Sequence, residues 1–295
     1  MKVSGFYDLN VPIDAIDGKS LTKICERLFN YGYRTVAFNQ VVTLSDDMFQ
    51  KPKKKRKLMD SNGSDDNLRE ADPIPPPAQI HLPEHLQGKL HVFNRLTLSV
   101  GEMSVLDRIN KNGNIRKYHL LAFSPVNEES LEAIASLPMD FDLLEVDVGC
   151  PSLSKSFSFK VKNKTVEKNL FLEVKYSPAI SDTEFLKNTL NLTHSINKLR
   201  CTKNVIFTSG AVSLSHIRGP YDVMNLGVLF GFVEGTVKAA ITTSCRNLLL
   251  KAEERGYGRI PVLLKPVTPK QWVNNYSNET EPKEKRSKDE SMEFQ

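Results

Sequence analysis

Seven short runs of mostly apolar residues recur along the chain. They cover residues 3–9, 35–38, 92–100, 119–123, 143–148, 171–176 and 204–207. Each run has the length and the flanking turn residues of a buried strand. Between the runs the apolar residues often fall at helical spacing, as do Leu21, Ile24, Cys25 and Leu28. Strands that alternate with helices predict a parallel sheet.

Capping residues give the predicted helices their bounds. Three N-caps precede apolar-periodic segments: Ser20 before residues 21–30, Asn127 before residues 128–137, and Asp182 before residues 183–199. A last helix over about residues 236–254 closes the predicted fold. Just before it, Gly227, Gly231 and Gly235 are spaced four residues apart, which suits a close crossing of two backbones inside the core.

The predicted fold class is α/β, of the TIM-barrel type and distorted or incomplete. A doubly wound open sheet is the alternative, and the barrel is favoured because no glycine-rich turn follows the first strand. The barrel domain is predicted to comprise residues 1–44 and 89–266. Residues 45–88 and 267–295 are polar, charged or proline-rich, so we predict a disordered insert and a disordered tail.

Composition places the chain among soluble proteins. Of its 295 residues, 40% are hydrophobic and 25% are charged, as in ordinary globular domains. The first eight residues reach a charge too early for a secretory signal, and the longest uncharged apolar run, residues 223–233, is too short to cross a bilayer. Four widely spaced cysteines without a Cys-x-x-Cys pair predict reduced thiols. We therefore expect an intracellular protein with no membrane contact.

The net charge of +5 is concentrated in one run. Subtracting the six basic residues between positions 51 and 57 leaves −1 for the rest of the chain. Such a compact cationic run is typical of a nuclear localisation signal, for which the candidates are Lys53, Lys54, Lys55, Arg56 and Lys57. The alternatives are a solvated charge run and an RNA-contacting arm. A second excess, of +4, lies within residues 155–175.

Polar residues follow the last predicted strand, at the mouth of the barrel where function usually lies. His216 and Arg218 stand close together in this loop. Either side chain could contact phosphate or pair with Asp222. Tyr221 follows, and Tyr176 ends the sixth predicted strand; both could stack on RNA bases or fill the core.

The first strand ends in Asp8-Leu9-Asn10-Val11-Pro12. This segment resembles the polymerase and histidinol phosphatase barrel family, whose members carry an Asp-Leu-His-x-His metal motif there. Asn10 and Pro12 replace both imidazoles, so a zinc or manganese site loses two ligands. A rearranged phosphoesterase site could still use Asp8, Glu145 and Asp147, but the prediction is that no metal binds.

Four blocks carry a second, more specific resemblance. They are residues 6–10, 31–37, 172–180 and 218–232, with sequences such as Leu-Glu-Val-Lys-Tyr-Ser-Pro-Ala-Ile and Arg-Gly-Pro-Tyr-Asp-Val. They resemble the thirty-kilodalton protein subunit family of ribonuclease P and ribonuclease MRP. The resemblance implies a noncatalytic, metal-free barrel that helps to assemble and stabilise a ribonucleoprotein. That particle matures the 5′ end of precursor tRNA while its RNA catalyses the reaction.

The resemblance also implies partners and a location. The partners are the catalytic RNA, precursor tRNA through the complex, and small ferredoxin-like subunits in a heterotetramer with two copies of this chain. The subunit is shared with ribonuclease MRP, which processes ribosomal RNA precursors, so the nucleus and nucleolus are expected. No cofactor and no catalytic residue are expected. Candidates for RNA or subunit contact are Lys155, Lys160, Lys162, Lys175, Tyr176, His216, Arg218 and Tyr221.

Overall fold

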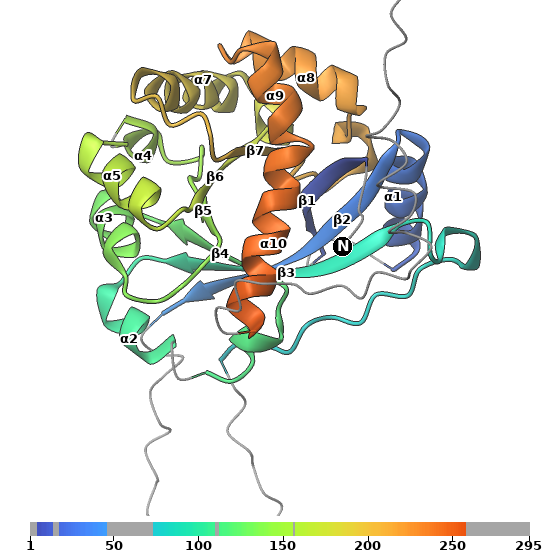
Figure 1. Cartoon of the computed structure of the whole chain (residues 1–295), viewed down its shortest axis with the longest axis horizontal. Coiled ribbons are helices and arrows are strands. Elements are labelled where there is room, and N and C mark those ends of the chain that lie inside the picture. Colours follow the sequence, from blue (N-terminus) through green and yellow to red (C-terminus); the bar gives the residue numbers. More distant parts are fainter. Residues whose placement is uncertain (1–4, 14–17, 46–72, 110–111, 156, 258–295) are drawn as a thin grey trace, which may run out of the picture. The chain divides into compact units, whose positions relative to one another are not determined.

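Seven parallel strands follow one another in chain order (Figure 1). The computed structural model describes residues 5–13, 18–45, 73–109, 112–155 and 157–257. The strands are β1 (Phe6–Pro12), β2 (Tyr33–Leu44), β3 (His91–Val100), β4 (Leu120–Pro125), β5 (Leu143–Glu145), β6 (Phe171–Lys175) and β7 (Val205–Thr208). All seven predicted strands are confirmed, and the parallel order confirms the barrel type rather than the doubly wound sheet, whose strand order would reverse.

The seam between β1 and β7 is closed by hydrogen bonds of the loop rather than by a strand ladder. The backbone N–H of Gly210 donates to the carbonyl of Asn10 at 2.9 Å, and the Ser209 hydroxyl donates to the same carbonyl at 3.2 Å. β1 gains one residue relative to β2 between Asp8 and Val11, which is a bulge. The barrel is therefore nearly closed, with its irregular strand at the seam.

Helices connect the strands. They are α1 (Gly18–Asn30), α2 (Leu106–Ile109), α3 (Glu128–Ser136), α4 (Pro151–Lys155), α5 (Phe159–Glu167), α6 (Ser177–Ser181), α7 (Thr183–Lys198), α8 (Pro220–Leu229), α9 (Glu234–Ala240) and α10 (Thr243–Tyr257). Short 3-10 turns occur at Glu84–Leu86, Met103–Val105, Ile115–Lys117 and Leu214–His216. None of the helices in the described part of the chain is long and apolar enough to cross a membrane.

Two of the predicted caps are confirmed. Asn127 accepts a hydrogen bond from the Ser130 backbone in a capping box, and Asp182 accepts from the Glu184 N–H at 2.8 Å. Ser20 is not a cap, because α1 already begins at Gly18.

The predicted last helix is two helices, not one. α9 and α10 are separated at Ile241, whose carbonyl accepts a hydrogen bond from the Tyr7 N–H at 3.2 Å. Ile241 itself is buried. The break therefore places the Ile241 carbonyl where the Tyr7 N–H of β1 donates to it at the seam.

α10 covers the end of the barrel at which the strands begin. Its side chains Cys245, Leu248, Leu249 and Ala252 form one apolar cluster with the first inward-facing residues of the strands, among them Tyr7, Ala37, Leu120, Leu143, Phe171 and Ile206. Figure 1 shows α10 as the long orange helix. Because this end is filled by apolar side chains, polar groups inside the barrel can reach solvent only toward the opposite, C-terminal mouth.

Part of the predicted insert is packed on the barrel. Residues 73–88 are described, and within them Ile74 and Leu86 are fully buried. Asn114 donates a hydrogen bond to the Ile74 carbonyl at 2.8 Å. The proline-rich composition suggested disorder, but the two apolar side chains give this stretch enough burial to be fixed. Residues 46–72 and 258–295 lie outside the described part, and so do the predicted disorder there and the localisation run.

Candidate functional site: the charged interior of the barrel

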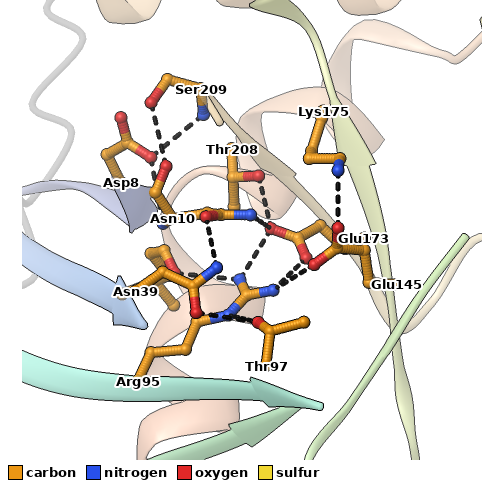
Figure 2. A network of polar contacts seen from close by, with 11 residues as sticks. Asp8, Asn10, Asn39, Arg95, Thr97, Glu145, Glu173, Lys175, Thr208 and Ser209 are labelled. Carbon is orange, nitrogen blue, oxygen red and sulfur yellow. Dashed lines mark hydrogen bonds and ion pairs between the residues drawn. The ribbon is translucent and has the colours of Figure 1, made fainter. Parts of the chain in front are cut away.

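A layer of polar side chains lies above the apolar floor of the barrel (Figure 2). Six of the seven strands contribute to it: Asp8 and Asn10 from β1, Asn39 from β2, Arg95 and Thr97 from β3, Glu145 from β5, Glu173 and Lys175 from β6, and Thr208 from β7. Sequence reasoning singled out Asp8, Asn10, Glu145 and Lys175 but missed Arg95 and Glu173. The sequence signal that could have identified both was a charged residue among the apolar residues of a predicted strand, at a position that faces the barrel interior.

Arg95 is the centre of the layer and is fully buried. Its Nη1 donates to Glu173 Oε1 at 2.7 Å and its Nη2 to Glu173 Oε2 at 2.5 Å, which is the two-pronged geometry of a strong charge-assisted pair. Nη2 also donates to Glu145 Oε2 at 2.8 Å. Nη1 reaches the carbonyl of Leu9 at 3.0 Å, in the bulged part of β1. The irregular strand thus supplies an acceptor to the guanidinium.

Neutral side chains complete the hydrogen bonding of Glu173. Glu173 Oε1 accepts hydrogen bonds from Asn10 Nδ2 at 2.9 Å and from the Thr208 hydroxyl at 2.6 Å. Asn39 in turn donates to Asn10 Oδ1 at 2.9 Å and accepts from the Thr97 hydroxyl at 2.8 Å. Burial by itself would raise the pKa of Glu173, but Arg95 and these donors hold it below its usual range. Glu173 is therefore ionised in the folded protein.

Lys175 closes the layer on the side of the mouth. Its Nζ donates to Glu145 Oε1 at 2.5 Å, and its side chain is 18% exposed. Burial would lower the pKa of Lys175, but the charge of Glu145 raises it. Gly210 lies over its aliphatic stem: a Cβ at this position would come within 2.9 Å of Lys175 Cδ, and the φ of Gly210 is +58°. Only glycine lets the loop after β7 approach this closely.

Asp8 holds the seam of the barrel. Its Oδ1 accepts hydrogen bonds from the backbone N–H of Ser209 at 3.0 Å and of Asn10 at 3.3 Å. Its Oδ2 is buried without a hydrogen-bond partner among the described residues. Burial raises the pKa of Asp8 to about 6, with Glu173 adding to the effect and the Ser209 contacts opposing it. This carboxylate accepts hydrogen bonds from the backbone on both sides of the seam.

The side chains of this layer do not fit a divalent metal. The two interior glutamates are already engaged by the guanidinium and the ammonium described above. A divalent cation needs free carboxylate or imidazole ligands. Within the described residues no cluster of three His, Cys, Asp or Glu side chains could hold a metal ion. Asp147, the third carboxylate of the rearranged phosphoesterase site, is exposed and accepts only the Gly149 N–H, at 3.0 Å, among the hydrogen bonds found here.

The loop after β7 is positioned by two buried tyrosines. The Tyr33 hydroxyl donates to the Arg218 carbonyl at 3.0 Å, and the Tyr176 hydroxyl accepts from the Arg218 N–H at 3.2 Å. Burial raises the pKa of both phenols. Of the two roles considered for Tyr176, the packing role is therefore the one that the structure displays.

The side chains of this loop remain available at the surface. Arg218 Nη1 donates to the Ser215 carbonyl at 2.8 Å, and neither Arg218 nor His216 forms the ion pair with Asp222 that the spacing suggested. His216 Nε2 lies 3.4 Å from the Ser181 hydroxyl. Tyr221 is 70% exposed and contacts Phe6 edge-on. Three of the candidate contact residues thus gather on one loop and the helix that follows it.

The candidate lysines of residues 155–175 do not form one patch. Lys175 is inside the barrel, Lys160 pairs with Glu132 at 2.6 Å on the surface, and the Lys162 ammonium lies 5.0 Å from the centre of the Phe159 ring. Lys155 ends α4, and its side chain is outside the described part. Lys160 and Lys162 remain exposed enough to contact RNA.

The fold and its interior define a class: a nearly closed parallel barrel whose polar centre is held by its own ion pairs. A family model described as RNase P subunit p30 matches residues 5–257. The chain is 30% identical to the ribonuclease P protein subunit p30 of Mus musculus over 274 residues, 90% of this chain and 92% of the relative. It is 23% identical to the probable ribonuclease P protein subunit 3 of Schizosaccharomyces pombe, covering 85% and 94%.

A solved structure has the same fold. A chain in the cryo-EM structure of archaeal ribonuclease P with mature tRNA aligns with a TM-score of 0.54 at 16% identity, over 89% of this chain and 96% of that one. The chain belongs to the ribonuclease P subunit p30 family. This family match favours the expected ribonucleoprotein role over the phosphoesterase alternative.

Proposed function

We propose that the chain is a noncatalytic protein subunit of ribonuclease P, which assembles with the catalytic RNA and supports 5′ maturation of precursor tRNA. The observation that carries the proposal is the family match over residues 5–257. The ion-paired interior supports the noncatalytic part, because every oxygen of Glu145 and Glu173 already contacts a cation. The chain binds no cofactor in this proposal.

The proposal extends to ribonuclease MRP and to the nucleolus. If the subunit is shared, the chain also serves the processing of ribosomal RNA precursors. Nuclear import is assigned to the run Lys53, Lys54, Lys55, Arg56 and Lys57, since several extended cations can bind separate acidic sites of an import receptor. Changing Lys54 and Lys55 to alanine is expected to leave a tagged protein in the cytoplasm.

RNA contact is assigned to the loop after β7. Arg218 has its backbone fixed by two tyrosine hydroxyls and its guanidinium engaged by a single carbonyl. A cation on a fixed backbone binds phosphate with little loss of conformational entropy. His216, the exposed Lys160 and the partly buried Lys162 provide further phosphate contacts that position RNA without reading its sequence.

Protein contact is assigned to α8. Tyr221, Val228 and Leu229 of α8 and Val233 just beyond it, called here the α8 face, are 70%, 47%, 74% and 75% exposed. Apolar and aromatic side chains gathered in this way are typical of a protein interface, whereas RNA surfaces are cationic. The proposed occupant is a small ferredoxin-like subunit, in a heterotetramer with two copies of this chain.

Recovery of RNA tests the function directly. The tagged full chain is purified natively from nuclear extract and the bound RNA is sequenced. Enrichment of the ribonuclease P RNA supports the main proposal, and enrichment of the MRP RNA supports the shared role. Absence of both RNAs contradicts the proposal.

A matched pair of variants tests the RNA contact. Arg218→Ala is expected to weaken precursor-tRNA cleavage by the reconstituted enzyme and to reduce the salt dependence by about one phosphate contact. Arg116→Ala removes an exposed arginine near the other end of the barrel, just before β4, and should have no effect. Equal behaviour of the two variants would remove Arg218 from the RNA interface.

A further inference from the structure

Apart from Asp8 at the seam, two cations and the two carboxylates that they contact lie together inside the barrel. Arg95 and Lys175 face Glu145 and Glu173, and each carboxylate oxygen of the two glutamates is within 2.8 Å of a cationic nitrogen. All four side chains are mostly or fully removed from solvent. Charges this deeply buried must be compensated nearby, because desolvation of an unpaired charge costs several kcal/mol.

The position of these four side chains in the barrel indicates their role. Arg95 and Glu173 lie near the middle of β3 and β6, and Glu145 and Lys175 end β5 and β6, all above the apolar floor formed with α10. In a barrel of this type the C-terminal ends of the strands carry the metal and the chemistry when there is any. Here the cationic charge at that place comes from a guanidinium and an ammonium.

We propose that Arg95 and Lys175 are the resident cations of this barrel, in place of metal ions, so that the folded chain neither needs nor binds a divalent metal at its C-terminal mouth. A metal ion could enter only by displacing both cations from carboxylates that they hold at close range. The neighbouring amides of Asn10 and Asn39 are also committed, to Glu173 and to each other. No oxygen of this layer is left for an incoming ion except Asp8 Oδ2, which sits alone at the seam.

The resident cations also position the loop that carries Arg218. The Lys175 stem supports Gly210, and the N–H of Gly210 and the hydroxyl of Ser209 close the seam on Asn10. Asn10 is itself held by Glu173 and therefore by Arg95. The ion pairs thus fix the start of the loop after β7 from below, as a metal centre would.

Metal analysis of the full chain tests the first half of the proposal. The chain purified without chelator is expected to contain well under one equivalent of zinc, manganese, iron or magnesium. Its melting temperature should be the same in EDTA and in millimolar Mn²⁺ or Zn²⁺. A stoichiometric bound metal, or a lower melting temperature in EDTA, would overturn the proposal.

A charge-balance cycle tests the second half. Lys175→Met leaves one uncompensated negative charge, and Glu145→Gln leaves one uncompensated positive charge. Each single change should lower the melting temperature by roughly 5–10 °C. The double variant Lys175→Met with Glu145→Gln is neutral in sum and should recover most of that loss. Full additivity of the two losses would show that the pair does not act as a unit and would refute the role of Lys175.

Both experiments use the chain alone. Their failure would leave the proposed role in the ribonucleoprotein untouched, because that role is tested by the RNA recovered with the chain.

Discussion

Inside the barrel, Arg95 is fully buried with carboxylates, a carbonyl and a hydroxyl around it. On the outside, Leu229 of α8 and Val233 just beyond it are three-quarters exposed, beside the exposed polar residues Asp222 and Asn225 of α8. The usual distribution, with apolar side chains buried and charges in water, is reversed at both places. Each reversal needs its own explanation.

The charged interior and the α8 face differ in how far their side chains find partners within the chain. In the charged interior the four ion-paired side chains hold one another, whereas Asp8 Oδ2 has no hydrogen-bond partner among the described residues. The α8 face stays largely exposed in the described chain, with Tyr221 in edge-on contact with Phe6, and burying it would release a favourable free energy of about 25 cal/mol for each Å². The comparison teaches that the interior side chains stabilise the barrel through contacts within the chain, while the α8 face keeps apolar area exposed to solvent.

The largest expected effect follows from removing the central cation. Arg95→Met keeps much of the volume but leaves Glu173 and Glu145 buried without Arg95, and we expect a loss of about 3–5 kcal/mol in the free energy of unfolding. Urea unfolding of the full chain measures it. The paired change Arg95→Met with Glu173→Gln should recover part of the loss, because one of the two orphaned charges is gone. A loss below about 1 kcal/mol for the single variant would mean that the interior does not depend on the guanidinium.

The next effect concerns the junction beneath the α8 face. A Cβ at Gly227 would come within 2.4 Å of Val237 Cγ1, so α8 and α9 cross at a distance that only glycine allows. Gly227→Val should cost about 3 kcal/mol through overpacking, measured by the same unfolding experiment. Gly235→Val is the matched control, since nothing lies within 4 Å of a Cβ there. If both valines were tolerated equally, the close crossing would not matter for stability.

The sequence predicted the elements well and the interior poorly. Apolar runs and caps such as Asn127 and Asp182 are local signals, and they located the strands and two helix starts. The pairing of Arg95 with Glu173 joins residues 78 positions apart, and no local pattern encodes which inward residues meet across a barrel. The sequence spacing also allowed an Arg218–Asp222 pair, which does not form in the loop conformation that Tyr33 and Tyr176 fix.

A smaller effect, a gain in the free energy of unfolding rather than a loss, is expected for a change of Asp8 at the seam. The pKa of Asp8 is about 6 in the folded chain, against an ordinary 3.8. The folded state therefore binds the proton more tightly, and the contribution of Asp8 to stability is present below about pH 4 and is lost as the pH rises through about 6. Asp8→Asn keeps an oxygen for the Ser209 and Asn10 N–H groups without the charge, and should stabilise the protein by roughly 2 kcal/mol at pH 7.5.

The pH dependence distinguishes this explanation from a general packing effect. The gain from Asp8→Asn should shrink toward zero between pH 6 and pH 4, as the wild-type carboxyl becomes protonated in the folded state. Asp222→Asn, at an exposed position on α8, is the control for removing a carboxylate that is not buried. A variant that is less stable than the wild type at pH 7.5 would mean that the Asp8 charge is stabilised by a partner.

The smallest effect on stability is expected on the α8 face, where the effect on assembly should be the greatest. Leu229→Asp with Val233→Asp places two charges on exposed positions, so the free energy of unfolding should change by no more than about 0.5 kcal/mol. Burying the same charges against a protein partner would be costly, and the double variant should fail to co-purify with the small protein subunits of the ribonucleoprotein. Val166→Asp on α5 is the matched control, because Val166 is 60% exposed and lies outside the α8 face. Undiminished co-purification of the double variant would show that the α8 face is not the protein-binding surface. The contrast between an ion-paired interior and an exposed docking surface would then not apply to α8.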